Sequence, residues 1–168
     1  MANLVIVLAF GLNIDLKTKP MELSVHSDEH FMKQALKQAN IAFEKGEVPV
    51  GAVVVAENRI IARAHNMTEQ LTDVTAHAEM LAITAAFDAI GGKYLNECTL
   101  YVTLEPCNMC AGALYWAQLG KLVFGASDQK RGFTLNPKNL LHPRTEVVRG
   151  LLENQSESLL KQFFAQLR

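Results

Sequence analysis

Two short segments, TAHAEMLA at 75–82 and LEPCNMC at 104–110, constrain the fold of this chain more than any other feature of its sequence. Each places residues that bind metals or protons where an apolar helical pattern begins. The first segment has a histidine and a glutamate two residues apart, and the second holds two of the chain's three cysteines. If these side chains act together, the fold has to bring two helix starts to one place.

The residues His77, Cys107 and Cys110 have the chemistry of a catalytic zinc site. Zinc in proteins takes tetrahedral nitrogen and sulfur ligands, and a catalytic site uses three of them and keeps the fourth position for water. Cys107 and Cys110 open a helix after Pro106 and are three residues apart, so we expect both sulfurs on one side of its first turn. We place His77 in the first turn of the preceding helix. The positive N-terminal ends of both helices would then be directed at the site and favour thiolates over thiols.

Glu79 has a different predicted role, because a carboxylate beside a metal-bound water can take its proton and deliver it to a substrate nitrogen. We predict Glu79 to be the catalytic acid/base and not a ligand. A redox interpretation of the CxxC pair leaves His77 and Glu79 unexplained, and a zinc ribbon needs a second CxxC, which the sequence lacks. We interpret the third cysteine, Cys98, as a buried core thiol.

Hydrophobic periodicity predicts an α/β fold in which helices cover both faces of one buried sheet. We expect helices at 28–44, 75–90, 107–118 and 156–166, and strands at 50–55, 60–64, 99–104, 121–126 and 145–148. Thr75 is the expected N-cap of the second helix, and Gly91 ends it. The last helix should turn Leu159, Leu160, Phe163 and Phe164 inward. We therefore predict a three-layer α/β/α sandwich around a central mixed five-stranded sheet.

The size and charge of the chain limit its organisation and its partners. Its 168 residues, 49% of them hydrophobic, fit one compact domain, which we assign to 27–168. A net charge of -1 gives no broad positive field, so an RNA partner needs a local basic patch. Such a loop contains Lys130, Arg131, Lys138, His142 and Arg144, although a solvated loop face is the alternative. The cysteine pattern favours a reducing, cytoplasmic compartment.

Residues 1–26 are expected to be an N-terminal extension of this domain. The extension contains an apolar stretch of nine residues, 4–12, but a membrane span takes about 20, so we predict no membrane anchor. It also lacks the clear flanks of a signal peptide. The alternatives are an extra edge strand, a loose tail, or sequence upstream of a true start at Met21. We favour the last, because the first well-formed element begins at Ser27.

At its histidine and cysteine motifs the chain resembles the cytidine-deaminase-like superfamily, and within it the bacterial tRNA-specific adenosine deaminases. The likeness covers 31–164 and rests on EVPVGAVVV, ARAHN, TAHAE, LYVTLEPCNMCAGAL, VFGASD and LLKQFF. It implies a cytidine deaminase-like fold, one zinc ion per chain, a homodimer, and hydrolytic conversion of adenosine to inosine at the wobble position of a tRNA anticodon loop. It also implies that Asn66 hydrogen-bonds the flipped base, Val50 lines its pocket and Asp128 sits near the ribose.

In this interpretation zinc activates water for attack on C6 of adenine, Glu79 moves the proton, and ammonia leaves. Two segments depart from the family pattern. One is YWAQ at 115–118, which resembles the corresponding sequence of guanine deaminases, and the other is 130–146. One alternative is therefore a small-molecule deaminase acting on guanine or on cytosine or cytidine. A catalytically silent, zinc-stabilised partner subunit is another, which the intact Glu79 disfavours.

The expected homodimer has a predicted interface on the helix that follows the cysteines. Four apolar residues there exceed what one core face needs, namely Ala111, Leu114, Tyr115 and Leu119. We expect Trp116, on the same helix, to pack either in the core or at the dimer contact.

Overall fold

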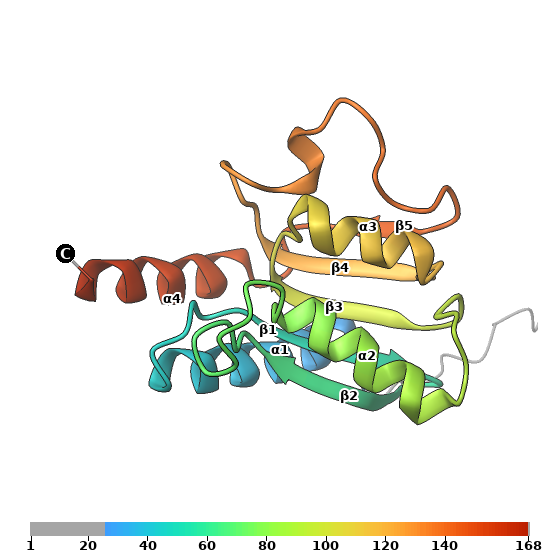
Figure 1. Ribbon diagram of the computed structural model, residues 1–168, viewed down its shortest axis with the longest axis horizontal. Coiled ribbons are helices and arrows are strands. Elements are labelled where there is room, and N and C mark those ends of the chain that lie inside the picture. The colour runs from blue at the N-terminus through green and yellow to red at the C-terminus, as the bar shows by residue number, and fades with distance from the viewer. Residues whose placement is uncertain (1–25, 168) are drawn as a thin grey trace, which may run out of the picture.

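The computed structural model describes residues 26–167, which form an α/β fold with helices on both faces of one sheet (Figure 1). Its elements are α1 (Asp28–Glu44), β1 (Gly51–Ala56), β2 (Arg59–His65), α2 (Ala78–Ile90), β3 (Thr99–Leu104), α3 (Asn108–Trp116), β4 (Lys121–Ala126), the 3-10 helix η1 (Phe133–Leu135), β5 (Glu146–Val148) and α4 (Glu153–Gln166). The five strands lie in the order β2-β1-β3-β4-β5. The first two pairings are antiparallel and the last two parallel, which confirms the predicted mixed five-stranded sheet.

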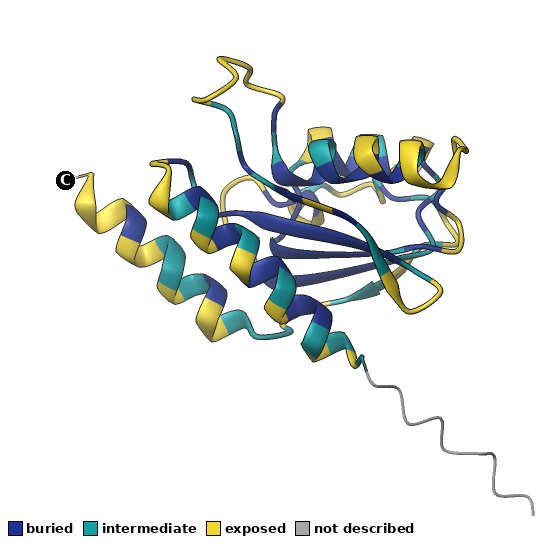
Figure 2. Cartoon of the chain, turned by 90° about the horizontal axis from the view of Figure 1, so that it is seen from below, coloured by how far each residue is buried: buried dark blue, intermediate teal, exposed yellow. Residues whose placement is uncertain are grey.

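Alternate side chains of the central strands enter two separate apolar layers, as the period-two geometry of a strand requires. Ala52 and Val54 of β1 belong to the layer shared with α2 and α3. Val53 and Val55 pack on the opposite face, together with Phe31 of α1. Figure 2 shows the buried strands between α2 on one side and α1 with α4 on the other, which confirms the three-layer sandwich.

Two local features hold α1, β1 and β2 together. The turn between β1 and β2 consists of Glu57 and Asn58, both in the left-handed region with φ of 47° and 59°, as a two-residue hairpin requires. A side-chain carbon at Gly51 would overlap the backbone of Ala35 and Ala39, so α1 rests directly on the β1 backbone. The predicted hairpin and first helix are confirmed.

The start of α2 was predicted wrongly, because its N-cap is His77 and not Thr75. The backbone N and Oγ1 of Thr75 both donate to Asp73 Oδ1, at 2.8 and 2.7 Å, and this turn holds Thr75 outside the helix. The end of the helix is as predicted, with Gly91 left-handed at φ 63°.

The other two helices differ from prediction at their ends. α3 is shorter than 107–118, because Cys107 is its N-cap and Gln118 is left-handed at φ 51°. α4 begins at Glu153 and not at 156, since the polar first turn has no apolar periodicity to reveal it. Phe163 packs in the core, but Phe164 is 48% exposed, so the prediction that it faces inward was wrong. In Figure 1 the C-terminal part of α4 runs past the end of the sheet.

The predicted N-terminal extension, 1–26, lies outside the described residues except for His26, so the domain boundary stays a prediction. From residue 26 to residue 167, no helix is both long enough and apolar enough to span a bilayer. Cys98 is buried, which confirms its assignment to the core.

Candidate metal centre and active site

His77, Cys107 and Cys110 converge where α2 and α3 begin, and their possible ligand atoms all lie within 4.8 Å of one another. His77 Nδ1 is 3.7 Å from Cys107 Sγ and 3.5 Å from Cys110 Sγ. Tetrahedral zinc bonds nitrogen at about 2.0 Å and sulfur at about 2.3 Å, which puts two such ligands about 3.6 Å apart. The observed spacing fits that value, so the three side chains could hold a metal ion.

Two of the three candidate ligands are helix N-caps. His77 and Cys107 both have extended backbones, and neither side chain makes a capping hydrogen bond. His77 was predicted to lie in the first turn of α2, but it lies directly before that turn, at the N-cap. Ser, Thr, Asp or Asn usually fills an N-cap, and losing such a cap costs about 1 kcal/mol. Cys110 lies in the first turn of α3, so the positive ends of both helices are directed at the ligand atoms.

The electrostatics of the group favour a thiolate next to an imidazole. The neighbouring Cys110 thiol lowers the pKa of Cys107 to about 4, and His77 adds to this effect. The pKa of Cys110 is raised, first by Cys107 and then by burial. The pKa of His77 is raised, mainly by its hydrogen bond with Cys107. Thiolates are the form in which cysteines bind metals.

Glu79 lies in the first turn of α2, two residues after His77, and is 4% exposed. Burial raises the pKa of its carboxyl, while its own backbone N–H and the charge of His77 act in the opposite direction. A carboxyl group whose pKa is shifted toward neutrality can both give and accept a proton during a reaction. The position of Glu79 therefore suits a general acid/base.

Asn66 follows β2 directly, and backbone hydrogen bonds connect it and the next residue to two other segments. Its backbone N donates to Val50 O at 3.0 Å. The next residue, Met67, donates to Ala76 O at 3.0 Å, and Ala76 immediately precedes His77. The segment 67–76 is thus closed at its base, so the residue after Asn66 is hydrogen-bonded to the residue before His77. Val50 and Asn66, the predicted pocket residues, are both buried.

Glu47 is a fully buried carboxylate that sequence reasoning missed. Its Oε1 accepts hydrogen bonds from the backbone N of Glu69 and Gln70, at 3.0 and 2.8 Å. Its Oε2 accepts from Asn66 Nδ2 and Thr68 Oγ1, at 3.2 and 3.1 Å. Burial raises the pKa of Glu47, but these four donors outweigh it and hold the pKa below its usual value. The only signal in the sequence was a charge directly before the apolar run VPVGAVVV.

Glu105 is a second buried carboxylate that the sequence did not reveal, between β3 and the cysteines. Its Oε2 accepts from Asp128 N at 3.0 Å, and its Oε1 accepts from Thr134 N at 2.9 Å. The backbone of Gly132 forms a bridge with that of Cys107. Glu105 therefore anchors the segment 128–134 against the candidate metal ligands.

Asp128 lies in the same segment, 128–134, but one oxygen of its carboxylate already accepts hydrogen bonds from the backbone of its own turn. Its Oδ1 accepts from the backbone N of Lys130 and Arg131, at 2.9 and 3.0 Å, which makes it the cap of a tight turn. The positive charge of Arg131 reaches the metal group, since it acts to lower the pKa of His77. The side chains of Lys130, Arg131, Lys138 and Arg144 are exposed, as a basic patch requires, whereas His142, the fifth predicted member, is half-buried.

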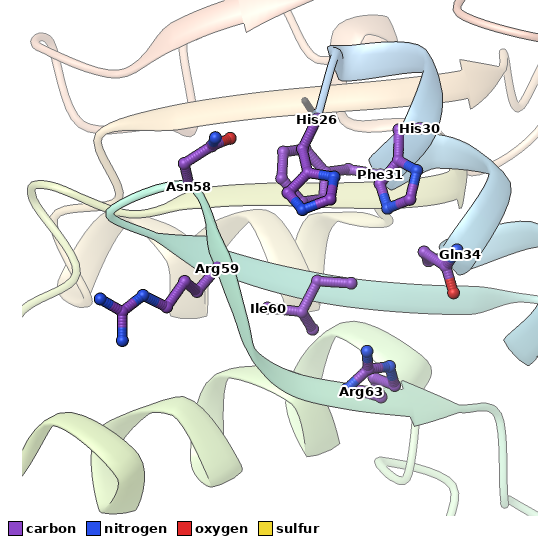
Figure 3. Close-up of a pocket in the computed structure, with 8 residues that line it drawn as sticks. All are labelled: His26, His30, Phe31, Gln34, Asn58, Arg59, Ile60 and Arg63. Carbon is purple, nitrogen blue, oxygen red and sulfur yellow. The ribbon is translucent and has the colours of Figure 1, made fainter. Parts of the chain in front are cut away.

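A pocket of about 360 Å³ lies at the other end of the sheet (Figure 3). Its lining comes from the start of α1 and from the β1–β2 hairpin, namely His26, His30, Phe31, Gln34, Asn58, Arg59, Ile60 and Arg63. β1 begins opposite His65, next to Asn66, and ends opposite Arg59. The length of the strand thus separates this pocket from the candidate metal group.

In sequence the chain is similar to known deaminases. A family model of MafB19-like deaminases matches residues 26–168. The chain is 50% identical to the tRNA-specific adenosine deaminase of Bacillus subtilis, over 84% of this chain and 91% of that protein. It is 49% identical to the tRNA-specific adenosine deaminase of Aquifex aeolicus, over 83% of this chain and 95% of that protein.

Solved structures from both of these related kinds of deaminase resemble the chain. One, from a study of A-to-I editing by tRNA:A34 deaminases at the wobble position of transfer RNA, is 45% identical with a TM-score of 0.72, and the match covers 78% of this chain and 99% of that one. The guanine deaminase of Bacillus subtilis is 39% identical with a TM-score of 0.58, covering 60% and 65%. Identity and coverage are both higher for the first.

Proposed function

The chain belongs to the MafB19-like deaminase family, and from this membership we propose that it converts adenosine to inosine at the wobble position of a tRNA anticodon by zinc-dependent hydrolysis. The observation that carries the proposal is the convergence of three candidate metal ligands at two helix starts, with the buried Glu79 beside them. The identity to tRNA-specific adenosine deaminases supports an RNA substrate.

We assign one zinc ion per chain to His77, Cys107 and Cys110. One imidazole and two sulfurs suit zinc, and three protein ligands leave one tetrahedral position free. Zinc held there supplies a nucleophile by lowering the pKa of a bound water. Elemental analysis of protein purified without chelators should find one zinc per chain, and protein without zinc would overturn the assignment.

The chain's own residues then move protons and position the substrate. Glu79 takes a proton from the attacking water and delivers it to N1 of adenine as the C6–N1 double bond opens, and the second proton of that water then passes to the amino nitrogen, which leaves as ammonia. Asn66 hydrogen-bonds the extruded base, Val50 forms the apolar wall of its pocket, and Asp128 supports the ribose. Anticodon bases are already unpaired, so placing one in the pocket costs little. A tRNA substrate and a thiolate site both fit a cytoplasmic location.

The homodimer also belongs to the proposal, with an interface that differs from the expected one. Ala111, Leu114 and Leu119 are buried in the core of a single chain, so assigning them to an interface was wrong. Trp116 is 78% exposed and Tyr115 39%, which excludes Trp116 from the core. Their rings meet edge to face with centroids 5.7 Å apart. We propose that this exposed aromatic pair lies at the contact with the second chain.

The function is tested by comparing substrates side by side. The assay measures ammonia and inosine from an anticodon stem-loop with adenosine at the wobble position, and from free adenosine, guanine and cytidine. A stem-loop with guanosine at that position is the matched control. We expect the adenosine stem-loop to react fastest. Faster turnover of guanine would favour the second candidate function, guanine deamination. The Tyr115-Trp116-Ala117 sequence and the likeness to a guanine deaminase support this candidate.

A further inference from the structure

We propose that Glu47 is a positioning and specificity residue, which locks the side-chain amide of Asn66 in one orientation toward the base. The inference rests on the proposed function, because that function assigns Asn66 to the base. Glu47 itself lies behind Asn66 and touches no reacting atom in this scheme.

Glu47 is held in place and cannot move away from Asn66. Two backbone N–H groups, those of Glu69 and Gln70, hold its Oε1 at 3.0 and 2.8 Å. The side chain is fully buried, so no water competes for these bonds. Its second oxygen, Oε2, is therefore presented to Asn66 from a fixed position.

Only one end of the Asn66 side-chain amide can face Glu47. A carboxylate only accepts hydrogen bonds, so the nitrogen of Asn66 has to lie toward it, as the 3.2 Å distance from Nδ2 to Oε2 shows. Turning the amide over would set Oδ1 against the carboxylate. That arrangement leaves two buried acceptors in contact, which is costly.

The Asn66 amide keeps only part of its hydrogen-bonding capacity for a ligand. Asn66 Nδ2, Glu47 Oε2 and Thr68 Oγ1 form a triangle with sides of 3.2, 3.2 and 3.1 Å. The two acceptors thus subtend about 60° at Nδ2, about half the angle between the two hydrogens of a planar amide. One hydrogen is directed into this gap, and the other points elsewhere. Among the described residues Oδ1 receives no hydrogen bond.

The locked amide therefore has one donor and one acceptor left. Asparagine pairs with adenine through this combination, because adenine offers the N6–H donor next to the N7 acceptor. Guanine offers two acceptors, O6 and N7, on the same edge, so it would leave Oδ1 facing an acceptor. Fixing the amide makes the pocket prefer adenine over guanine.

The test is a double-mutant cycle of Glu47→Gln and Asn66→Ala, read as kcat and KM on the adenosine stem-loop. A glutamine at 47 brings its own N–H donors, so it no longer dictates one orientation of Asn66. We expect Glu47→Gln to lower kcat/KM by about 10- to 100-fold, the scale set by a buried hydrogen-bonding group that loses its partner. In the Asn66→Ala background the same change should matter less than about threefold, since the two residues act as one unit.

Specificity gives a second readout, which a purely structural role would not move. The ratio of binding affinities for stem-loops with adenosine and with guanosine at the wobble position should fall by about tenfold in Glu47→Gln, the scale of one base contact. Glu44→Gln, at an exposed glutamate three residues away, is the matched control and should leave both readouts unchanged. Equal losses from Glu47→Gln in both backgrounds, with an unchanged ratio, would overturn the proposal.

A third readout does not depend on activity. In the free protein, hydrogen exchange of the Asn66 side-chain NH₂ group, followed by NMR, should be slow in wild type and fast in Glu47→Gln. If Glu47→Gln does not fold, Glu47→Asp keeps the charge but shortens the side chain, and should give the same change with smaller size. Equal exchange in wild type and variant would overturn the positioning. Slow exchange in a wild type that deaminates no stem-loop would overturn the proposed function and leave the positioning intact.

Discussion

Glu79 and Glu47 are both buried glutamates, yet their surroundings move their pKa values in opposite directions. Burial raises the pKa of Glu79. At Glu47 the effect of burial is outweighed by four hydrogen-bond donors, and the pKa falls below its usual value. Glu79 is therefore prepared to exchange a proton, whereas Glu47 stays charged and holds its neighbours in place.

Replacing Glu79 with Gln tests the proton-transfer role. The change keeps size and shape but removes the titratable oxygen, so metal ligands and pocket should survive. General acid/base catalysis contributes about 10²- to 10⁴-fold, and Glu79 serves more than one transfer, so we expect single-turnover rates to fall by about 10⁴-fold or more. Zinc content and stem-loop affinity should stay near wild type, as should all properties of the exposed control Glu97→Gln. Activity within about tenfold of wild type would contradict the role.

Residue type and spacing were enough to predict that His77, Cys107 and Cys110 come together, because thiols and an imidazole at helix starts have recognisable chemistry in the sequence. The roles of Glu47 and Glu105 could not be predicted in this way. A buried carboxylate is explained by its donors, and here these lie 19 to 29 residues along the chain. Thr75 misled the prediction for a different reason, because its partner Asp73 is close in sequence but holds Thr75 in a turn before the helix.

At the scale of elements, the close packing of α1 on β1 should be the most sensitive contact. Gly51→Ala places a side-chain carbon into the backbone of α1, so we expect it to lower the free energy of unfolding by about 3 kcal/mol, the upper end of the overpacking range. Gly112→Ala on α3 is the matched control, because nothing lies within 4 Å of its added carbon. It should stabilise α3 by about 0.5 to 1 kcal/mol. Urea unfolding measures both, and equal stability of the two variants would refute the packing argument.

The segment 128–134 should contribute charge to RNA binding. We expect replacement of Lys130 and Arg131 with Ala to weaken stem-loop binding and to make its dependence on salt less steep, by up to about two phosphate contacts. Titrations between 50 and 200 mM salt, about the range over which such contacts matter, measure the slope. Lys37 and Lys93, exposed on other surfaces, provide the control double variant. A slope unchanged in the test variant would show that the loop is only solvated.

Element types were predictable because apolar residues recur with the period of a helix or a strand. The start of α2, both ends of α3 and the start of α4 were not, since they depend on single hydrogen bonds and on left-handed residues such as Gln118. The first turn of α4 is polar and exposed at Asn154 and Gln155, so no helical spacing of apolar residues indicates that it is part of a helix. These errors moved helix ends by a few residues and left the order of the elements unchanged.

At the scale of the whole molecule, the arrangement of layers followed from the order of elements, but the association of chains did not. Exposure depends on which helix covers which face, and the sequence could not separate the buried Leu114 from the exposed Trp116. The same limit explains why Phe164 was predicted to be buried.

Light scattering at micromolar concentration should show two chains per particle. Trp116→Glu should give single chains, because it places a charge in the proposed contact, and should lower stem-loop activity if both chains complete the RNA site. Phe164→Glu is the control, since Phe164 is also an exposed aromatic but lies on α4. A wild type that remains monomeric would contradict the dimer. Dissociation by Phe164→Glu alone would move the contact to α4.

His77 and Cys107 are the N-caps of their helices, but neither side chain makes a capping hydrogen bond. An ion that binds both residues fixes them in the extended conformation that a helix start needs, and so takes the place of two capping side chains. The free energy of metal binding is then also free energy of folding. We expect the cellular level of the protein to rise and fall with the zinc content of the growth medium. Chains without a bound ion should unfold more often and be degraded sooner.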